Sequence, residues 1–178
     1  MSPELAALLG EFGLSEALLA ERKLCQFAEA EVLVEAEVGV DGRSHMLVPE
    51  AAEAWQAMKA AAADEGITLQ LVSAFRSIAR QAEVLRRKLA RGESIVDVLR
   101  VCAPPGYSEH HTGRAVDVAT PGAAILDAAF ADSAAFAWLQ AHADVYGFCL
   151  SFPQGNALGY AYEPWHWCYR GAAGEGCA

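Results

Sequence analysis

Two short segments of the chain concentrate histidine and carboxylate side chains. The first spans residues 108–117 and contains His110 and Asp117, and the second contains Glu163 and His166. A catalytic zinc ion takes three protein ligands from imidazole and carboxylate groups and keeps a fourth position for water, whose proton a separate carboxylate must accept. The residue types therefore predict a zinc site with His110, Asp117 and His166 as ligands and Glu163 as general base.

The spacing within the first segment requires a turn. Residues 114–119 alternate as a short strand, with two valines on one face and Asp117 on the other. An uninterrupted strand would place His110 on the face opposite Asp117. The chain must therefore turn between them, and Gly113 is where it most easily can.

The second segment cannot be a helical zinc motif. Pro164 fixes its own φ and favours an extended conformation at Glu163, which argues against a His-Glu-x-x-His helix. If residues 165–168 are extended, His166 faces one side and the two neighbouring tryptophans face the other. Glu163 then approaches the metal across a bend at Pro164, and the tryptophans serve as walls that orient His166.

A histidine or aspartate taken singly is more often a solvated or hydrogen-bonded structural residue than a ligand. The four residues together favour a metal site. His111 would face away from its neighbour His110 in an extended segment, so we interpret it as structural or as a residue of the rim. His45 and His142 have no carboxylate or cysteine at ligand spacing and are left out of the site.

The motifs resemble those of a known family. The pattern Ser-x-His-x-x-Gly-x-Ala-x-Asp at 108–117, with Glu-Pro-Trp-His at 163–166, is similar to the zinc D-alanyl-D-alanine carboxypeptidases of the VanY type. Their superfamily includes lysostaphin-like peptidases and the hedgehog domain. Ser-Ala-Phe-Arg-Ser at 73–77 resembles the family's Ser-Gly-Tyr-Arg-Ser, Gln81 stands where its glutamine follows, and Gly-Phe at 147–148 precedes the last strands. The resemblance covers roughly residues 45 to 170.

The resemblance implies an activity and further site residues. It implies hydrolysis of the terminal D-Ala-D-Ala bond of peptidoglycan-type peptides, with one zinc ion per chain. Arg76 would be a second electrophile for the oxyanion, and Arg76, Ser108 and Gln81 would hold the peptide. Two of these have structural alternatives, because Ser108 could satisfy nearby backbone and Gln81 could be an exposed helix residue.

Other functions use the same metal frame. They are an L-Ala-D-Glu endopeptidase, a D,D-dipeptidase, and a zinc-containing binding domain without turnover of the hedgehog kind. The presence of all three ligands and the base favours catalysis. We expect the flexible loop near Gly155 to control cleft shape and so to separate the enzymatic alternatives.

Composition is consistent with an enzyme of this kind. The chain has 178 residues, 54% of them hydrophobic, and a mean hydropathy of +0.17, which predicts one domain with its own core. A net charge of −10 and a pI near 4.9 disfavour binding to nucleic acid or an anionic membrane surface. The resemblance implies a peptidoglycan peptide or muropeptide as the partner, and we expect a monomer. Within the basic stretch 76–91, only Arg76 is assigned a functional role.

The cysteines and the first residues leave the compartment open. The five cysteines form no CxxC arrangement, so they predict neither a metal knot nor an oxidising compartment. The first residues lack a basic region and a sustained apolar core, which predicts neither a signal peptide nor a membrane span. The bacterial cell envelope is expected if peptidoglycan is the substrate, and the cytoplasm is the alternative.

Helices and strands alternate without a regular βαβ repeat, which predicts an α+β fold with a mainly antiparallel central sheet flanked by helices. Residues 1–44 are expected to form an N-terminal helical cap and first strand, 45–170 the zinc peptidase core, and 171–178 a disordered tail. The expected helices start at residues 2 and 15, span 49–65, 77–91 and 133–146, and include a short one after 94; the expected strands span 31–38, 46–48, 67–73, 114–119, 148–152 and 161–169.

Overall fold

Serine side chains begin most of the longer helices. In the computed structural model, which describes residues 1–39 and 41–171, several serines accept a hydrogen bond from the backbone N–H three residues later. These N-cap residues are Ser2, Ser15, Ser77, Ser94 and Ser133. Such caps satisfy backbone donors that the first helical turn leaves unpaired, so the helix starts follow from local sequence. The helices are α1 (Pro3–Gly10), α2 (Glu16–Glu21), α3 (Pro49–Asp64), α4 (Ile78–Ala90), α5 (Ile95–Val101) and α6 (Ala134–His142), with 3-10 helices η1 (Glu109–Thr112), η2 (Ala128–Asp132) and η3 (Ala143–Tyr146).

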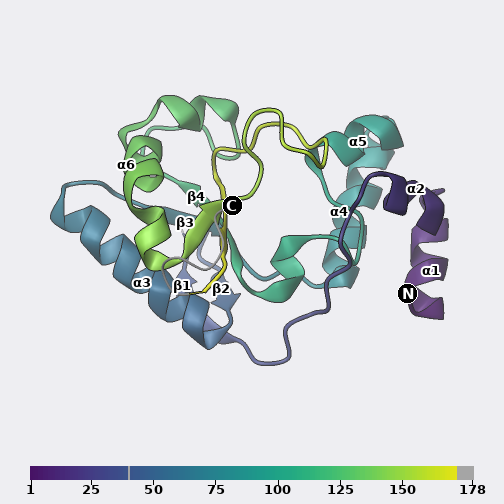
Figure 1. Cartoon of the computed structure of the whole chain (residues 1–178), viewed down its shortest axis with the longest axis horizontal. Helices are drawn as coiled ribbons and strands as arrows, with labels where there is room; N and C mark the ends of the chain where they lie inside the picture. Colours follow the sequence, from purple (N-terminus) through teal and green to yellow (C-terminus); the bar gives the residue numbers. More distant parts are fainter. Residues whose placement is uncertain (40, 172–178) are drawn as a thin grey trace.

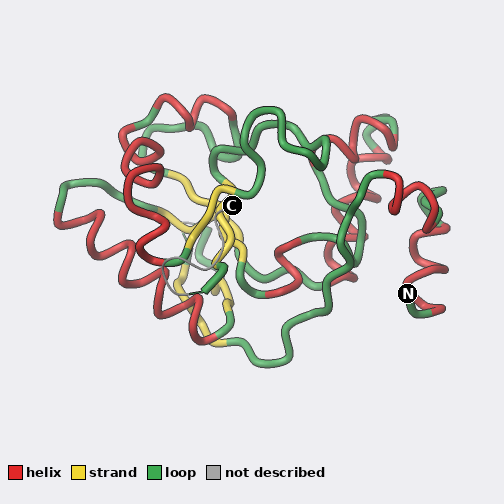
Figure 2. Tube along the Cα trace, in the orientation of Figure 1, coloured by secondary structure: helices red, strands yellow, loops and turns green. Residues whose placement is uncertain are grey.

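The strands form two antiparallel sheets. They are β1 (Val34–Val38), β2 (Ser44–Leu47), β3 (Gln70–Ser73), β4 (Ala115–Ala119), β5 (Phe148–Leu150) and β6 (His166–Tyr169). β1 and β2 form a hairpin, and the other four strands lie in the order β3-β4-β6-β5. Neighbouring strands of this larger sheet are antiparallel, and helices lie around it (Figure 2). The predicted α+β fold with a mainly antiparallel central sheet is confirmed.

The register of the central strands brings site residues together. Asp117 on β4 lies directly opposite His166 on β6 and also pairs with Ser73 on β3. Because side chains alternate along a strand, the valines on either side of Asp117 enter the main core. Directly opposed residues of an antiparallel pair share a face, so Asp117 and His166 both point away from that core.

Two apolar clusters hold the elements in place. In the larger cluster α3 and α6 contribute to a core with the central sheet, and Trp55 and Met58 of α3 are fully buried there. In the second cluster, α1 and α2 supply leucines that pack against α4 and α5. Figure 1 shows the two groups of helices at opposite ends of the molecule, with the sheet nearer α3 and α6.

We propose that residues 1–44 fold onto the core as a cap. The second apolar cluster joins the first two helices to α4 and α5, and β1 pairs with β2 across the predicted boundary. Backbone hydrogen bonds continue this attachment: Phe27 donates to the carbonyl of Gly106, and Ala30 to that of His111.

Several predicted elements are shorter in the structure. The strands expected over 67–73, 148–152 and 161–169 contain only Gln70–Ser73, Phe148–Leu150 and His166–Tyr169. Irregular contacts replace the ladder, since Ala161 N donates to the Arg100 carbonyl and Glu163 N to that of Phe152. The helix expected over 133–146 ends as α6 and continues as η3. The predicted disordered tail lies, apart from Gly171, outside the described residues.

His111 is a buried structural residue. It is 0% exposed, its Nε2 accepts a hydrogen bond from Gly106 N at 3.0 Å, and its Nδ1 donates to the Arg76 carbonyl. An accepting Nε2 requires the proton to be on Nδ1, so both ring nitrogens are satisfied by backbone. The structural interpretation of His111 is thus supported, although His111 lies on the 3-10 helix η1 rather than in an extended segment.

Replacing His111 by phenylalanine should destabilise the fold. The change leaves Gly106 N and the Arg76 carbonyl without their partners, and each unpaired buried group costs about 1–3 kcal/mol. We expect the free energy of unfolding, measured by urea denaturation of the metal-free protein, to fall by about 2 kcal/mol or more. The exposed change Asp64→Asn should stay within about 0.5 kcal/mol of wild type. An equal stability of both variants would contradict the structural role.

Candidate metal centre

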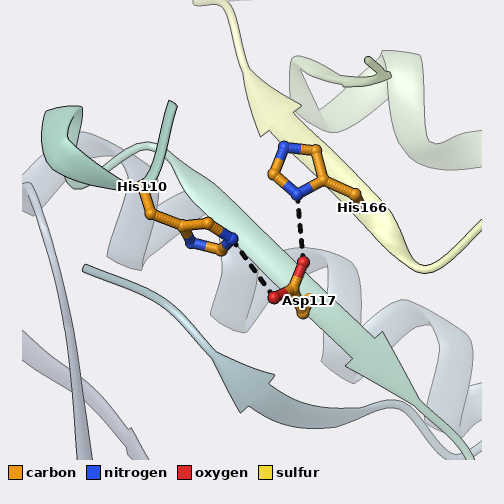
Figure 3. A group of neighbouring side chains, drawn as sticks. All are labelled: His110, Asp117 and His166. Atoms are coloured by element: carbon orange, nitrogen blue, oxygen red, sulfur yellow. Dashed lines mark hydrogen bonds and ion pairs between the residues drawn. The ribbon is translucent and has the colours of Figure 1, made fainter. Parts of the chain in front are cut away.

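Three buried side chains converge on one point. Potential ligand atoms of His110, Asp117 and His166 all lie within 4.8 Å of one another. His110 Nε2 is 3.2 Å from Asp117 Oδ2, and His166 Nδ1 is 3.0 Å from Asp117 Oδ1. Figure 3 shows both imidazoles directed at the carboxylate. His110 comes from the 3-10 helix η1, Asp117 from β4 and His166 from β6. The structure therefore brings together the three residues that were predicted as ligands.

Local backbone structure positions His110. The residue lies in η1, which Ser108 caps and Gly113 ends in the left-handed conformation at φ +64°. The turn predicted at Gly113 is present, and it lets the chain pass from η1 into β4. His110 Nδ1 contacts the Ala74 carbonyl at 2.7 Å, which leaves Nε2 to face Asp117.

Glu109 plays the matching role for His166. Its Oε2 lies 2.9 Å from His166 Nε2, and the same carboxylate accepts hydrogen bonds from Ser151 and Arg170. With Nε2 occupied, His166 presents Nδ1 to Asp117, an arrangement in which an outer carboxylate fixes the ring and its tautomer. Sequence reasoning missed Glu109. Its position between Ser108 and His110 was the available signal, but its partners are distant along the chain.

Asp117 and Glu109 are both held ionised. Burial alone raises the pKa of Asp117, but the neighbouring His110 and His166 outweigh it and hold that pKa well below its usual range. Burial also raises the pKa of Glu109, but the hydrogen bond from His166 and nearby charges lower it to about 2. Burial lowers the pKa of His166, but its hydrogen bonds to Asp117 and Glu109 raise it to about 10, so the two carboxylates flank a protonated imidazole, and metal binding at Nδ1 would release that proton.

Glu163 lies beside the triad in a different environment. It is only 9% exposed, and burial, to which nearby Asp117 adds, raises the pKa of its carboxyl to about 7 against the attraction of His166. His166 N donates to the Glu163 carbonyl at 3.1 Å, so the chain bends around Pro164 as predicted. A carboxyl with a pKa near neutrality can both accept and return a proton.

Arg76 belongs to a buried polar network next to Asp117. Its guanidinium donates to Gln81 Oε1 at 3.0 Å and to Ser73 Oγ at 2.9 Å, and lies 3.7 Å from Asp117 Oδ2. Gln81 is 0% exposed and donates to the Ala103 carbonyl at 2.6 Å. The alternative of an exposed Gln81 is therefore wrong, because tertiary packing covers this face of α4.

Ser108 has a structural role in the described chain. Its hydroxyl accepts a hydrogen bond from His110 N at 3.3 Å and so helps to begin η1. This is the structural alternative that the sequence left open. A contact of Ser108 with substrate stays a prediction, although the side chain lines the same cleft as the triad.

A cleft of about 620 Å³ opens over these residues. Its lining includes the triad, Glu109, Glu163, Arg76 and Ser108, with residues of the β1–β2 hairpin, α4 and the segment 101–103. Residues 153–159, the loop expected to shape the cleft, do not line it. Phe152 and Tyr160, which flank this loop, do. The loop near Gly155 reaches the cleft only through these flanking residues, and its control of cleft shape stays a prediction.

Aromatic side chains around His166 differ in their roles. Trp167 enters the main core and Trp165 lines the cleft. The ring that lies against His166 is instead Phe152, at a centroid distance of 4.8 Å. Among the other histidines, His45 lines the cleft outside the triad, and His142 packs on Trp138.

The donor set fits a zinc ion. Two imidazole nitrogens and a carboxylate oxygen within reach of one another match the three protein ligands of a catalytic zinc site. A buried carboxyl outside this set matches the proton acceptor that such sites require. In the described part of the chain, every helix is too short or too polar to cross a membrane.

An α+β domain with this site defines a candidate metal-dependent hydrolase. The chain belongs to the VanY family, described as D-alanyl-D-alanine carboxypeptidase, which it matches over residues 44–172. The family is one of peptidases, and the resemblance read from the motifs is confirmed.

Individual relatives agree with this assignment. The putative carboxypeptidase YodJ of Bacillus subtilis (strain 168) is 37% identical over 126 residues, which are 68% of this chain and 45% of YodJ. The chain therefore matches less than half the length of that relative. The solved structure of the LdcB LD-carboxypeptidase is 33% identical, with a TM-score of 0.72 over 80% of this chain and 70% of that one. The fold is shared with a mutant of the D,D-pentapeptidase VanY solved in complex with Zn(II), at 24% identity, a TM-score of 0.65 and 79% coverage of each chain.

Proposed function

We propose that the protein is a zinc-dependent D,D-carboxypeptidase that removes the terminal D-alanine from peptidoglycan-type peptides. The observation that supports this best is the convergence of the His110, Asp117 and His166 ligand atoms within 4.8 Å, beside the buried Glu163. The family match supports the reaction class.

The proposed roles follow from the chemistry of the side chains. His110 Nε2, an Asp117 oxygen and His166 Nδ1 would hold one zinc ion per chain, because the other ring nitrogens are engaged by Ala74 and Glu109. When bound, zinc supplies a Lewis acid that acidifies water and polarises a carbonyl. Glu163 would accept a proton from the attacking water and return it to the leaving amine.

Arg76 would stabilise the negative charge that develops on the scissile carbonyl oxygen. Its guanidinium is fixed by Ser73 and Gln81 before substrate arrives, and such preorganised donors are most effective in a site that excludes water. The net charge of −10 makes a local cation necessary for any peptide that ends in a carboxylate. Ser108, which lines the cleft, is proposed to help hold the peptide, and the buried Gln81 to act through Arg76, whose guanidinium it fixes.

A second candidate reaction is L,D-carboxypeptidase activity. The observation that favours it is the likeness to the LdcB LD-carboxypeptidase at 33% identity. Its substrate would be a tetrapeptide stem ending in one D-alanine, rather than a pentapeptide ending in two. The same metal ligands and base would serve either reaction, so the difference lies in how the cleft holds the residue before the cleaved bond.

Incubation with defined peptides tests the function. We expect the zinc-loaded protein to release D-alanine from a cell-wall pentapeptide, and this release to stop with a chelator and return with zinc. Three further substrates are tested in parallel. A tetrapeptide reports L,D-carboxypeptidase activity, a tetrapeptide-linked muropeptide reports endopeptidase activity, and free D-Ala-D-Ala reports dipeptidase activity. Absence of metal-dependent hydrolysis of all four would contradict the proposal and favour a binding domain.

A further inference from the structure

The hydroxyl of Tyr160 is buried at the cleft. Tyr160 is 8% exposed, and its phenolic oxygen is buried without a hydrogen-bond partner among the described residues. Buried tyrosine hydroxyls ordinarily find a partner, because leaving one unpaired costs free energy. Trp138 Nε1 and His45 Nε2 also lack a hydrogen bond, but Trp138 does not line this cleft and His45 Nε2 has the Asp41 carboxylate 3.5 Å away, whereas Tyr160 lines the cleft with the triad and Glu163.

The surrounding contacts fix the Tyr160 ring. It packs on Phe152 at a centroid distance of 4.8 Å, and the Arg22 guanidinium lies 5.2 Å from its centroid. Arg22 is itself anchored to the carbonyls of Leu99 and Leu158. These contacts pack the ring on two sides and so help to fix the position of the hydroxyl.

Side-chain hydrogen bonds fix the backbone of Tyr160 as well. Asn156 Nδ2 donates to the Tyr160 carbonyl at 2.8 Å, and Tyr160 N donates to Asn156 Oδ1 at 3.2 Å. Through these two bonds, Asn156 fixes the end of the loop 153–159 next to Tyr160. Burial raises the pKa of Tyr160 well above its ordinary value, with Cys102 and Glu163 adding to the effect, so the hydroxyl stays a hydrogen-bond donor at neutral pH.

We propose that the Tyr160 hydroxyl donates a hydrogen bond to an oxygen of the C-terminal residue of the bound peptide. This inference rests on the proposed function. Glu163 would return its proton to the leaving amine, so the departing residue lies on the Glu163 side of the cleft. Tyr160 stands three residues before Glu163 in the chain and lines that same cleft. A peptide C-terminus offers oxygen acceptors, which is the chemistry that an unpaired O–H donor requires.

Replacing Tyr160 by phenylalanine tests the proposal, because it removes the hydroxyl and keeps the ring contacts. We expect kcat/KM for the pentapeptide, or for whichever peptide the wild type cleaves, to fall about tenfold to a hundredfold, the range for a hydrogen bond to a charged group. Zinc affinity and the free energy of unfolding should not fall, since no protein partner loses its bond. The matched control is Tyr162→Phe, because Tyr162 packs on Phe136 and is absent from the cleft lining.

The outcomes separate this proposal from the proposed function. A kcat/KM of Tyr160→Phe within twofold of an active wild type would overturn the role of the hydroxyl and leave the function standing. An equal loss in Tyr162→Phe would also overturn it, because the effect would then be structural. If the wild type neither cleaves the peptides nor binds them by calorimetry, both proposals fail together.

Discussion

Glu163→Gln should reduce turnover by a factor on the order of 10² to 10⁴ while the fold and the metal are kept. Glutamine preserves the shape of the side chain but cannot accept the proton of the attacking water, and general base catalysis is worth that range. Burial raises the pKa of Glu163 to about 7, a value suited to accepting a proton and returning it. The residue is outside the group of potential ligands, so zinc should stay bound.

The measurements for Glu163→Gln are kcat with the pentapeptide and zinc per chain by elemental analysis. Glu53→Gln, an exposed change on α3, is the matched control and should match the wild type in both. A variant that keeps zinc and at least a tenth of wild-type turnover would remove Glu163 as the base. Loss of zinc together with turnover would instead place Glu163 among the ligands.

His166→Ala should remove the metal and with it the hydrolysis. Loss of an outer-shell partner lowers metal affinity by about 10- to 100-fold, and loss of a ligand should exceed this. His166 is the residue whose Nδ1 faces Asp117 while Glu109 occupies Nε2, so alanine removes a ligand that is already oriented. His110→Ala should have the same effect, because His110 Nε2 also faces Asp117.

Zinc affinity can be measured by competition with a chromophoric chelator. His142→Ala provides the control, since His142 packs on Trp138 away from the triad, and its affinity should equal that of wild type. Unchanged affinity in both His110→Ala and His166→Ala would show that the metal binds elsewhere. Wild-type protein without stoichiometric zinc after loading would end the assignment of the centre.

Local sequence was sufficient for much of the fold. The serine caps fixed the helix starts, and the alternation around Asp117 correctly divided β4 into a core face and a site face. Strand ends were predicted less well. Residues 161–163 look extended in the sequence, but the backbone N–H groups of Ala161 and Glu163 bond to the carbonyls of Arg100 and Phe152 instead of a neighbouring strand.

The candidate site shows the same division. His110, Asp117, His166 and Glu163 could be proposed from the sequence, because zinc chemistry demands few residue types and their spacing is compact. Glu109 could not, because its importance arises from contacts with His166 and Arg170, which are far along the chain. The burial of Gln81 was likewise invisible, since it depends on the packing of the segment 102–103 against α4.

The amino-acid sequence by itself determined which groups could form a metal centre and where the chain had to turn between them, because residue chemistry and backbone preferences are local properties. Only the tertiary structure decided which ring nitrogen of each histidine faces Asp117, and that the Tyr160 hydroxyl is buried without a partner among residues 1–39 and 41–171. These depend on register and packing: Asp117 meets His166 because β4 pairs with β6, and Tyr160 is enclosed because Phe152 and Arg22 pack on its ring.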